Sequence, residues 1–332
     1  MQLEKIPLKD GVEIPLVAII SNPLSSTNAG GMEAVRALVE ASANVVHFEL
    51  NGIDTVDEAL SLFGKANPAM LIINGGDGTI GAVLASILYK SHFTKIPPIA
   101  FLPGGKTNMT AADFGSKGKP TKVLQKLLKI ARENRIEESL QSRNLIEMDL
   151  GDGELPRVGT FFGAAGIVKG IFWCRENAYS KGLPNSLAHL AAAFKLTTAA
   201  FGVGKSKELL ISDPMAINLP GHGRMSGQYS AVITTTLNKL LLGLKPYGTS
   251  GVGGLRFAAI EVGGKNFFRA IKGLIFGAFG EKSIEGTHVR KGDEVRIEGT
   301  DPVTLDGEIY HPLPGKPILL RGDKALAFVA LT

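Results

Sequence analysis

Cysteine is nearly absent from this chain of 332 residues, in which Cys174 is the only one. A single thiol cannot form an internal disulfide, and this fits a reducing compartment. Long apolar runs are also missing: the most apolar long segment, 187–201, is short and includes His189 and Lys195. The first sixteen residues contain an early acid and two prolines and have no apolar centre of the signal-peptide type. These absences predict a cytoplasmic protein without a membrane span.

A strong excess of one charge is lacking as well. The 36 Lys and Arg residues against 31 Asp and Glu leave a net charge of +5, so a nucleic-acid partner is not expected. Hydrophobic residues make up 44% of the chain, which excludes a disordered protein. The length allows two ordinary domains, each with its own core. The 41 glycines follow no collagen-like period and indicate many tight turns.

One segment, Ser116 to Arg135, concentrates positive charge, with seven basic residues against the single acid Glu133. Apolar residues recur within it at helical spacing, so the segment predicts a helix with one apolar and one lysine-rich face. An ordinary surface helix is the simpler interpretation. The alternative is a surface that meets anionic lipid headgroups, which would place the protein peripherally on the inner face of a membrane.

The first half of the chain alternates strand and helix patterns. Apolar strands are expected over Pro15–Pro23, Asn44–Leu50, Ala69–Asn74 and Pro97–Gly105, with helices over 30–43, 55–66 and 79–90 between them. Repeated β–α units of this length predict a parallel sheet with helices on both faces. The first domain is therefore an α/β domain.

After about Asn144 the pattern changes to short strands, many of them separated by turn residues, which predicts an antiparallel β-sandwich or barrel. Helices are expected within 185–201 and 266–280. We expect a nucleotide-binding α/β domain over 1–143 joined by the tail 318–332. A β-rich substrate domain is expected over 144–317, with a cleft between the two.

Three glycine-bearing loops follow strands of the first half: SNPLSSTNAGG, NGGDGT and LPGGKTN. Ligands of an open parallel sheet collect at the carboxyl ends of its strands, where glycines let backbone N–H groups approach an anion. Thr79 is a candidate cap for the helix after Gly78. The three loops together predict a polyphosphate pocket. Taken alone, GGDGT could be only a tight turn.

NGGDGT after a buried strand, followed downstream by LPGGKTN and by VTLDGEIY at Val303–Tyr310, resembles the diacylglycerol kinase and sphingosine kinase type of lipid kinase. The order of the motifs and the α/β-then-β layout extend the resemblance over nearly the whole chain. It implies ATP and Mg²⁺ as cofactors and a lipid alcohol, such as diacylglycerol, a ceramide or a sphingoid base, as phosphate acceptor at a membrane surface. Asp77 would lie beside phosphate and Mg²⁺.

The resemblance also implies residue roles. Glu308 would accept the proton of the lipid hydroxyl, with Asp306 beside it in the catalytic segment. A two-residue hairpin turn is the plain structural interpretation of Asp306–Gly307, and both can hold. Residues that would bind the nucleotide are Asn22, Pro23, Ser25, Gly75, Gly76, Asp77, Gly78, Thr79, Gly104, Gly105, Lys106, Thr107 and Asn108.

The chain departs from the family pattern at several positions. Ser26 stands where the first loop usually has Gly, Ala82 replaces a helix Glu, and Lys106 replaces a Thr. The Asn-Asp pair of the family is Asn108–Met109 here, with Asp113 one turn later. In the second half, Gly253 occupies the position of an Asp that accompanies a structural Mg²⁺, which speaks against a second metal. The residue at 106 could place a cation among phosphates or lie in solvent.

Two other functions remain open at this point. NAD kinase-type enzymes share the GGDGT loop and a two-domain plan, but the Asn-x-Glu segment of those enzymes has no convincing match here. A non-catalytic nucleotide- or lipid-binding protein would explain Ala82, Lys106 and Met109. The persistence of Asp77 and Glu308 favours the lipid kinase.

Overall fold

The computed structural model describes residues 14–173, 212–240, 245, 251–275, 279–280 and 282–331. Within it the chain forms two compact units, Met1–Arg143 with Ala325–Thr332, and Asn144–Lys324. Cys174 and the helix expected within 185–201 lie outside the described residues.

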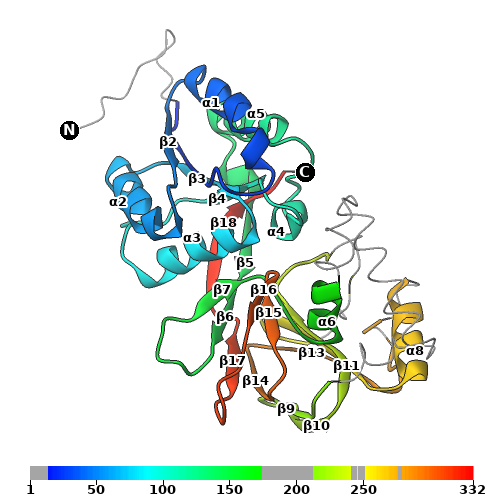
Figure 1. The fold of residues 1–332 in the computed structure, drawn as a ribbon. Coiled ribbons are helices and arrows are strands. Elements are labelled where there is room, and N and C mark those ends of the chain that lie inside the picture. Colours follow the sequence, from blue (N-terminus) through cyan, green and yellow to red (C-terminus); the bar gives the residue numbers. More distant parts are fainter. Residues whose placement is uncertain are drawn as a thin grey trace. The chain divides into compact units, whose positions relative to one another are not determined.

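The first unit is built on one sheet of six strands in the order β2-β1-β3-β4-β18-β5 (Figure 1). Every pair among β1, β2, β3, β4 and β18 that hydrogen-bonds is parallel. This confirms the expected parallel sheet. The strands are β1 (Val17–Ser21), β2 (Val45–Glu49), β3 (Met70–Gly75), β4 (Ile99–Pro103), β5 (Leu140–Asn144) and β18 (Ala325–Val329).

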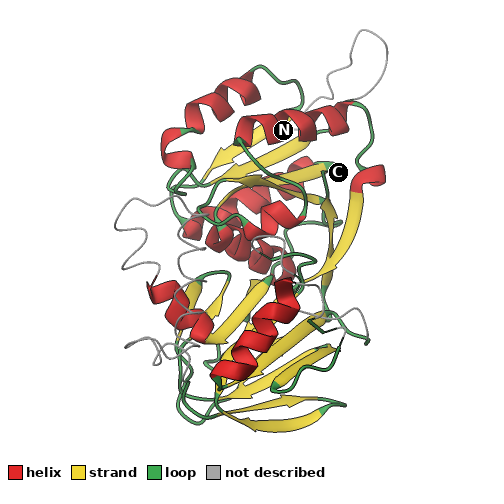
Figure 2. Ribbon diagram, turned by 90° about the vertical axis from the view of Figure 1, so that its right-hand side faces the viewer, coloured by secondary structure: helices red, strands yellow, loops and turns green. Residues whose placement is uncertain are grey.

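Helices cover both faces of this sheet, which explains why β1, β3 and β4 are buried along their whole length. Figure 2 shows these layers, with α1 and α5 on one face and α2 and α3 on the other. The bounds are α1 (Met32–Glu40), α2 (Val56–Ala66), α3 (Asp77–Tyr89), α4 (Met109–Asp113) and α5 (Pro120–Arg132), with short 3-10 turns η1 (Asn28–Gly30), η2 (Ile53–Thr55) and η3 (Glu137–Ser139).

The basic segment is helix α5, as its periodicity predicted. Pro120 occupies its first turn, where a missing N–H costs nothing. Its apolar side chains pack with α1 and the sheet in one core cluster and are buried: Val123, Leu124, Leu127, Leu128 and Ala131. The opposite face carries exposed lysines, among them Lys122 and Lys126.

The second unit consists of two antiparallel sheets, ordered β10-β9-β14-β17-β6-β7 and β13-β12-β11-β8-β15-β16. Inward side chains of both sheets form one apolar core, including Met148 of β6, Phe162 of β8, Phe257 of β12 and Leu320 of β17. This is the predicted β-sandwich. The strands of the first sheet are β6 (Ile146–Asp149), β7 (Arg157–Gly159), β9 (Met215–Leu219), β10 (Gly223–Gly227), β14 (Glu294–Glu298) and β17 (Ile318–Arg321).

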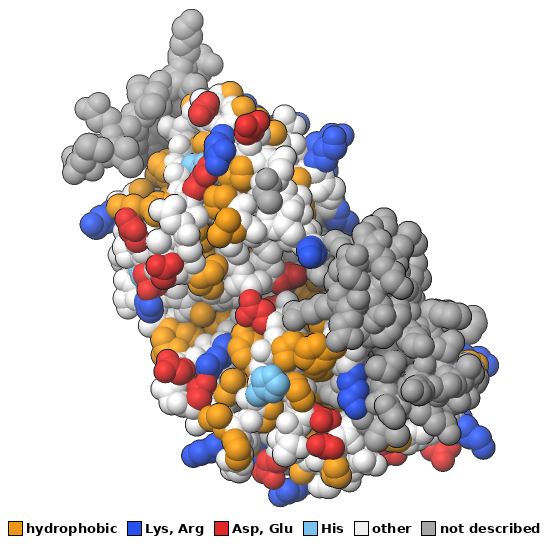
Figure 3. All heavy atoms as spheres, in the orientation of Figure 1, with side chains coloured by type: hydrophobic (Ala, Val, Ile, Leu, Met, Phe, Trp, Pro, Cys, Tyr) orange, Lys and Arg blue, Asp and Glu red, His pale blue; other side chains and the backbone are white. Residues whose placement is uncertain are grey.

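The second sheet contains β8 (Phe161–Ala165), β11 (Tyr229–Thr235), β12 (Leu255–Glu261), β13 (Thr287–Gly292), β15 (Val303–Leu305) and β16 (Glu308–Tyr310). Helices α6 (Gly166–Trp173) and α8 (Gly264–Ile275) pack on its outer face, where Ile167 of α6 and Phe267 of α8 join one apolar cluster. The surface in Figure 3 shows acidic and basic side chains interspersed over the described residues, in keeping with the small net charge.

One expected boundary is wrong. The tail was expected to join the first unit from residue 318, but 318–324 belong to the second unit. The reason is that β17 pairs on both sides with strands of that unit, β14 and β6. Only from Ala325 does the chain enter the first unit, where β18 pairs with β4.

Candidate active site

The three glycine-bearing loops meet at the carboxyl ends of β1, β3 and β4. The backbone N–H of Gly76 donates to Ser25 Oγ at 3.1 Å, which ties the second loop to the first. Thr27 ties the first loop to the third, since its N–H donates to the carbonyl of Gly104 at 3.0 Å and its hydroxyl to the carbonyl of Gly105 at 2.9 Å. The fold therefore brings together loops whose contacting residues lie up to 78 positions apart in the sequence.

The glycines are required because two of the loops touch backbone to backbone. A Cβ on Gly105 would lie 2.6 Å from the Cα of Gly76, and one on Gly104 would lie 2.8 Å from the N of Gly75. No L side chain fits at either contact without moving a loop. The glycines were expected to approach an anion, but their first structural task is to let these loops pack on each other.

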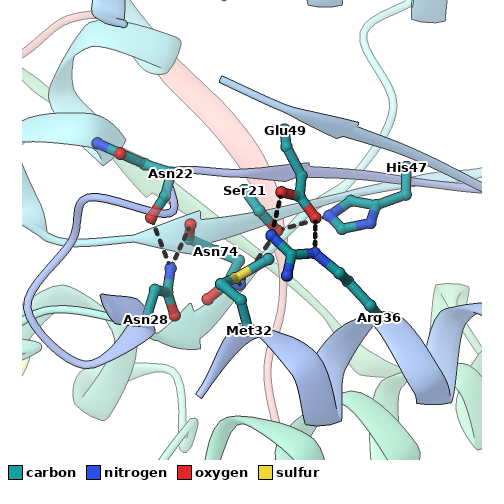
Figure 4. Close-up of polar contacts among 8 residues, drawn as sticks. All are labelled: Ser21, Asn22, Asn28, Met32, Arg36, His47, Glu49 and Asn74. Atoms are coloured by element: carbon teal, nitrogen blue, oxygen red, sulfur yellow. Dashed lines mark hydrogen bonds and ion pairs between the residues drawn. The ribbon is translucent and has the colours of Figure 1, made fainter. Parts of the chain in front are cut away.

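An amide network holds the first loop, as Figure 4 shows. The side-chain amide of Asn28 donates to the carbonyls of Asn22 and Asn74, at 2.9 and 3.2 Å. The amide of Asn74 in turn donates to Ser21 Oγ at 3.1 Å, and this oxygen lies 2.8 Å from His47 Nε2. Ser21 Oγ and His47 Nε2 therefore share a hydrogen bond at the end of this network.

Burial lowers the pKa of His47, which favours the neutral imidazole. Sequence reasoning missed Ser21, Asn28 and His47. A signal was present for two of them, since Ser21 ends one apolar strand and His47 interrupts another, and buried polar groups need partners.

Helix α3 begins at Asp77, with Gly76 as the residue before it, and Thr79 makes no capping bond to the backbone. The expected cap is therefore wrong. The hydroxyl of Thr79 is buried and instead accepts a hydrogen bond at 2.9 Å from the side-chain amide of Asn22. This bond links the strand end of the first loop to the first turn of α3.

Asp77 lies at the N-terminus of α3, where the helix dipole favours a negative charge. Burial raises the pKa of Asp77 to about 6, against the opposing effect of the Thr110 N–H and hydroxyl, which both donate to it. Its Oδ1 is buried and has no hydrogen-bond partner among the described residues. A desolvated carboxylate oxygen without a donor is unusual in a folded protein, and it marks a place where a cation would be stabilised.

The third loop leads into α4 through a compact turn. Asn108 has φ of 50°, and its side chain brackets Gly105, accepting from that residue's N–H at 2.7 Å and donating to its carbonyl at 2.6 Å. Lys106 is exposed at the outside of this turn, next to the half-buried Thr107. The turn fixes where Thr110 meets Asp77.

Asp113, the acid that follows the family's expected position by one turn, is engaged elsewhere. Its Oδ2 accepts from Arg143 Nη1 at 2.8 Å, and both side chains are almost fully buried. The guanidinium of Arg143 also lies over the ring of Phe114, 5.0 Å from its centroid. Asp113 thus ties α4 to β5 and is not available to a ligand.

In the second unit, the LDGE motif is the hairpin between β15 and β16. Asp306 and Gly307 have φ of 49° and 91°, a type I′ turn. The Asp306 carboxylate accepts three hydrogen bonds, from the Thr160 N–H and hydroxyl and the Phe161 N–H, at 2.9, 3.0 and 2.9 Å. Both of its oxygens are therefore occupied in anchoring the turn to β8.

Glu308, two residues on, has an exposed side chain. Its Oε2 accepts from the hydroxyl of Tyr310 at 3.0 Å. Burial, followed by the negative charge of Glu308, raises the pKa of Tyr310, so this phenol stays a donor. Arg157, held by Asp152 at 2.6 Å, adds a positive charge beside the tyrosine.

Gly253 cannot be replaced by an Asp without rearrangement. It has φ of 129°, and a Cβ there would lie 2.3 Å from the carbonyl carbon of Gly292. Across the described ranges, no three His, Cys, Asp or Glu side chains gather as a metal site.

Comparison with known proteins gives a likeness for most of the first unit. Residues 16–137 match the model of the diacylglycerol kinase catalytic domain. The resemblance inferred from the glycine loops is thereby confirmed, and all three loops fall inside the matched segment. No curated protein matches the chain.

Solved structures of the same kind extend the likeness to the whole chain. A diacylglycerol kinase from Bacillus anthracis str. Sterne superposes with a TM-score of 0.62 at 16% identity, covering 96% of this chain and 98% of that one. A second protein from the same organism, proposed to be a diacylglycerol kinase, gives 0.63 at 13% identity with the same coverage. At such identities these likenesses establish the shared two-unit fold. Of the helices that the structure describes, none has the length and apolar composition needed to cross a bilayer.

Proposed function

We propose that this protein is an ATP-dependent lipid kinase that transfers the γ-phosphate to a hydroxyl of a lipid alcohol, with diacylglycerol as the first candidate. One observation carries the proposal: in a segment that matches the diacylglycerol kinase catalytic domain, three glycine loops contact one another, and Asp77, which directly follows one of them, has a buried carboxylate oxygen, Oδ1, that lacks a partner among the described residues. The loop contacts are already made in the protein alone, so the site is preorganised.

Magnesium fits this donor set in a limited way. Asp77 supplies one carboxylate oxygen, and the described residues offer no second or third acid to complete a protein-only site. Mg²⁺ normally takes one or two carboxylates and completes its shell with phosphates and water. When bound with ATP, it would neutralise charge on the phosphates that the loops hold.

Glu308 is proposed as the proton acceptor. The lipid hydroxyl oxygen forms a bond to the γ-phosphorus, its proton passes to the Glu308 carboxylate, and the bond from phosphorus to the bridging oxygen of ADP breaks. An exposed carboxylate on a rigid two-residue hairpin suits this role, because one oxygen is oriented by Tyr310. The anchored Asp306 contributes by fixing that hairpin.

The proposal also includes contact with a membrane, where a long-chain lipid alcohol resides, and a place on the cytoplasmic side. It requires Glu308 to reach the terminal phosphate, and the cleft expected between the two units remains a prediction. The acceptor itself is open among diacylglycerol, ceramide and sphingoid bases, because an apolar pocket discriminates weakly between similar chains.

The deciding experiment is transfer of label from ATP to extracted total lipid, with NAD assayed in parallel. We expect a labelled lipid phosphate and no labelled dinucleotide. Glu308→Gln and Asp77→Asn should each lose at least about 100-fold in rate, whereas Glu298→Gln, a matched change at an ion-paired glutamate of β14, should keep it. Labelled NADP would favour a nucleotide kinase instead. Tight ATP binding with no transfer to any lipid would favour a binding protein.

A further inference from the structure

Helix α8 of the second unit has two chemically distinct faces. Its inner face is apolar and packs into the cluster on the outer side of the β13-β12-β11-β8-β15-β16 sheet, with Phe267 and Ala270 buried. Its outer face carries four exposed side chains: Lys265, Phe268, Arg269 and Lys272. The helix contains no acidic residue. Charge of one sign and an aromatic ring therefore share the outer face.

Phe268 is the unusual member of this face, because its side chain is 45% exposed. Lys265 precedes it by three positions and Lys272 follows by four, so the ring lies between two cations on the helix surface. A second phenylalanine, Phe172 at the end of α6, is 39% exposed. Helix α6 covers the same sheet, and Ile167 of α6 belongs to the cluster that receives α8.

We propose that the outer face of α8 docks the second unit onto a bilayer that contains anionic lipids. The lysine and arginine side chains would approach the headgroups, and the Phe268 ring would enter the boundary between headgroups and acyl chains. This inference rests on the proposed lipid kinase function, since it names the surface by which the enzyme would reach its substrate. Basic side chains beside an exposed aromatic ring are a combination found at membrane–water interfaces.

The contrast with α5 favours α8. Helix α5 is more basic, with four cations against three, but its large apolar side chains face the core, and the exposed Lys122 and Lys126 have no exposed apolar side chain beside them on that helix. It offers electrostatic attraction alone, which salt screens. Helix α8 adds an apolar contact, and among its cations only Arg269 forms an ion pair with a described residue, the exposed Glu285.

The experiment is co-sedimentation of the full chain with vesicles of phosphatidylcholine, with or without phosphatidylglycerol, in the absence of ATP and of any acceptor lipid. We expect binding to the anionic vesicles only. Lys265→Glu with Lys272→Glu should weaken that binding more than about twentyfold, and Phe268→Ala about tenfold. The matched control on α5, Lys122→Glu with Lys126→Glu, should weaken it less than about threefold. All of these sites are exposed, and a thermal melt checks that each variant folds.

A second assay separates this inference from the proposed function. The α8 variants should lose phosphorylation of long-chain diacylglycerol in vesicles and keep phosphorylation of a short-chain, monomeric diacylglycerol. If the α5 pair weakens vesicle binding as much as the α8 pair, or if the α8 variants bind vesicles as the parent does, the α8 surface is wrong while the kinase stands. Binding of an oligonucleotide, lost in the α8 variants, without vesicle binding would also overturn it. Vesicle binding that depends on α8, without phosphate transfer to any lipid, would support the docking surface and overturn the proposed kinase function.

Discussion

Each unit has one Asp-Gly pair in its proposed catalytic segment, Asp77-Gly78 at the start of α3 and Asp306-Gly307 in the β15–β16 hairpin, and their carboxylates are in opposite states. Asp306 accepts three hydrogen bonds from Thr160 and Phe161, so its capacity is used within the fold. Asp77 accepts from Thr110 but leaves Oδ1 buried and without a partner among the described residues. The comparison shows that the carboxylate of the same dipeptide is fully hydrogen-bonded in the hairpin and only partly so at the start of α3. The two carboxylates differ in the hydrogen bonds that their oxygens accept, and not in residue type.

The largest effect is expected from Asp77→Asn. The change removes the negative charge that the site offers to a metal–phosphate ligand, so phosphoryl transfer should fall by at least about 100-fold. The fold should persist, since the Asn side chain can still accept from Thr110. Initial rates with labelled ATP and a melting curve measure both. Loss of folding together with activity would show that Asp77 is an anchor like Asp306.

Asp306→Ala should act on stability first. It leaves two backbone N–H groups and one hydroxyl without their acceptor at the β8 edge, and we expect a loss of about 2–4 kcal/mol in the free energy of unfolding. Guanidinium unfolding followed by circular dichroism measures it. An unchanged unfolding midpoint would mean that water replaces the carboxylate at no cost.

Gly105→Ala tests whether the loops must touch. The new Cβ would lie 2.6 Å from the Cα of Gly76, so one loop has to move, and we expect a loss of about 1–3 kcal/mol in stability and weaker nucleotide binding. Gly30→Ala is the matched control, because nothing lies within 4 Å of its Cβ. Calorimetry compares the affinity of both variants for ADP. Equal affinities would contradict the close packing of Gly105 against Gly76.

The protonation of Asp77 should make the free energy of unfolding depend on pH, with a size similar to the effect of Gly105→Ala. Its pKa is raised from 3.8 to about 6, so between these values the native state binds more protons than the unfolded chain. The parent should therefore lose stability relative to Asp77→Asn as the pH rises from about 4 to about 7, by about 1–3 kcal/mol. Paired unfolding titrations across this range measure it. A difference that does not change with pH would contradict the desolvated state.

The smallest effect concerns Tyr310→Phe. Loss of the hydroxyl removes the donor to Glu308 Oε2, so the carboxylate is less well oriented and its anion less stabilised. We expect a rate decrease of about three- to tenfold, measured as the initial rate of transfer from labelled ATP. Tyr229→Phe, in the core of the same unit, is the control. Equal rates for the parent and Tyr310→Phe would show that the bond has no part in the reaction.

Much of the fold followed from local pattern. The apolar runs before the glycine loops form buried parallel strands, as predicted. The basic segment, with apolar residues at helical spacing, forms α5 with one buried face. The LDGE motif became a hairpin because Asp-Gly adopts positive φ readily. The predicted domain boundary was wrong for 318–324. A short apolar strand fits either unit by its pattern, and the sequence does not show which strands it will pair with.

The sequence by itself determined where strands, helices and turns form and which loops carry glycine and acid, because periodicity and turn chemistry act over a few residues. Only the tertiary structure decided which oxygens are used. The donors to Asp306 belong to residues 145 and 146 positions earlier, and the partner of Asp113 lies 30 positions later. Hydrogen-bond satisfaction and desolvation depend on such distant neighbours, and they distinguish the anchor at Asp306 from the Asp77 carboxylate, whose Oδ1 has no donor among the described residues.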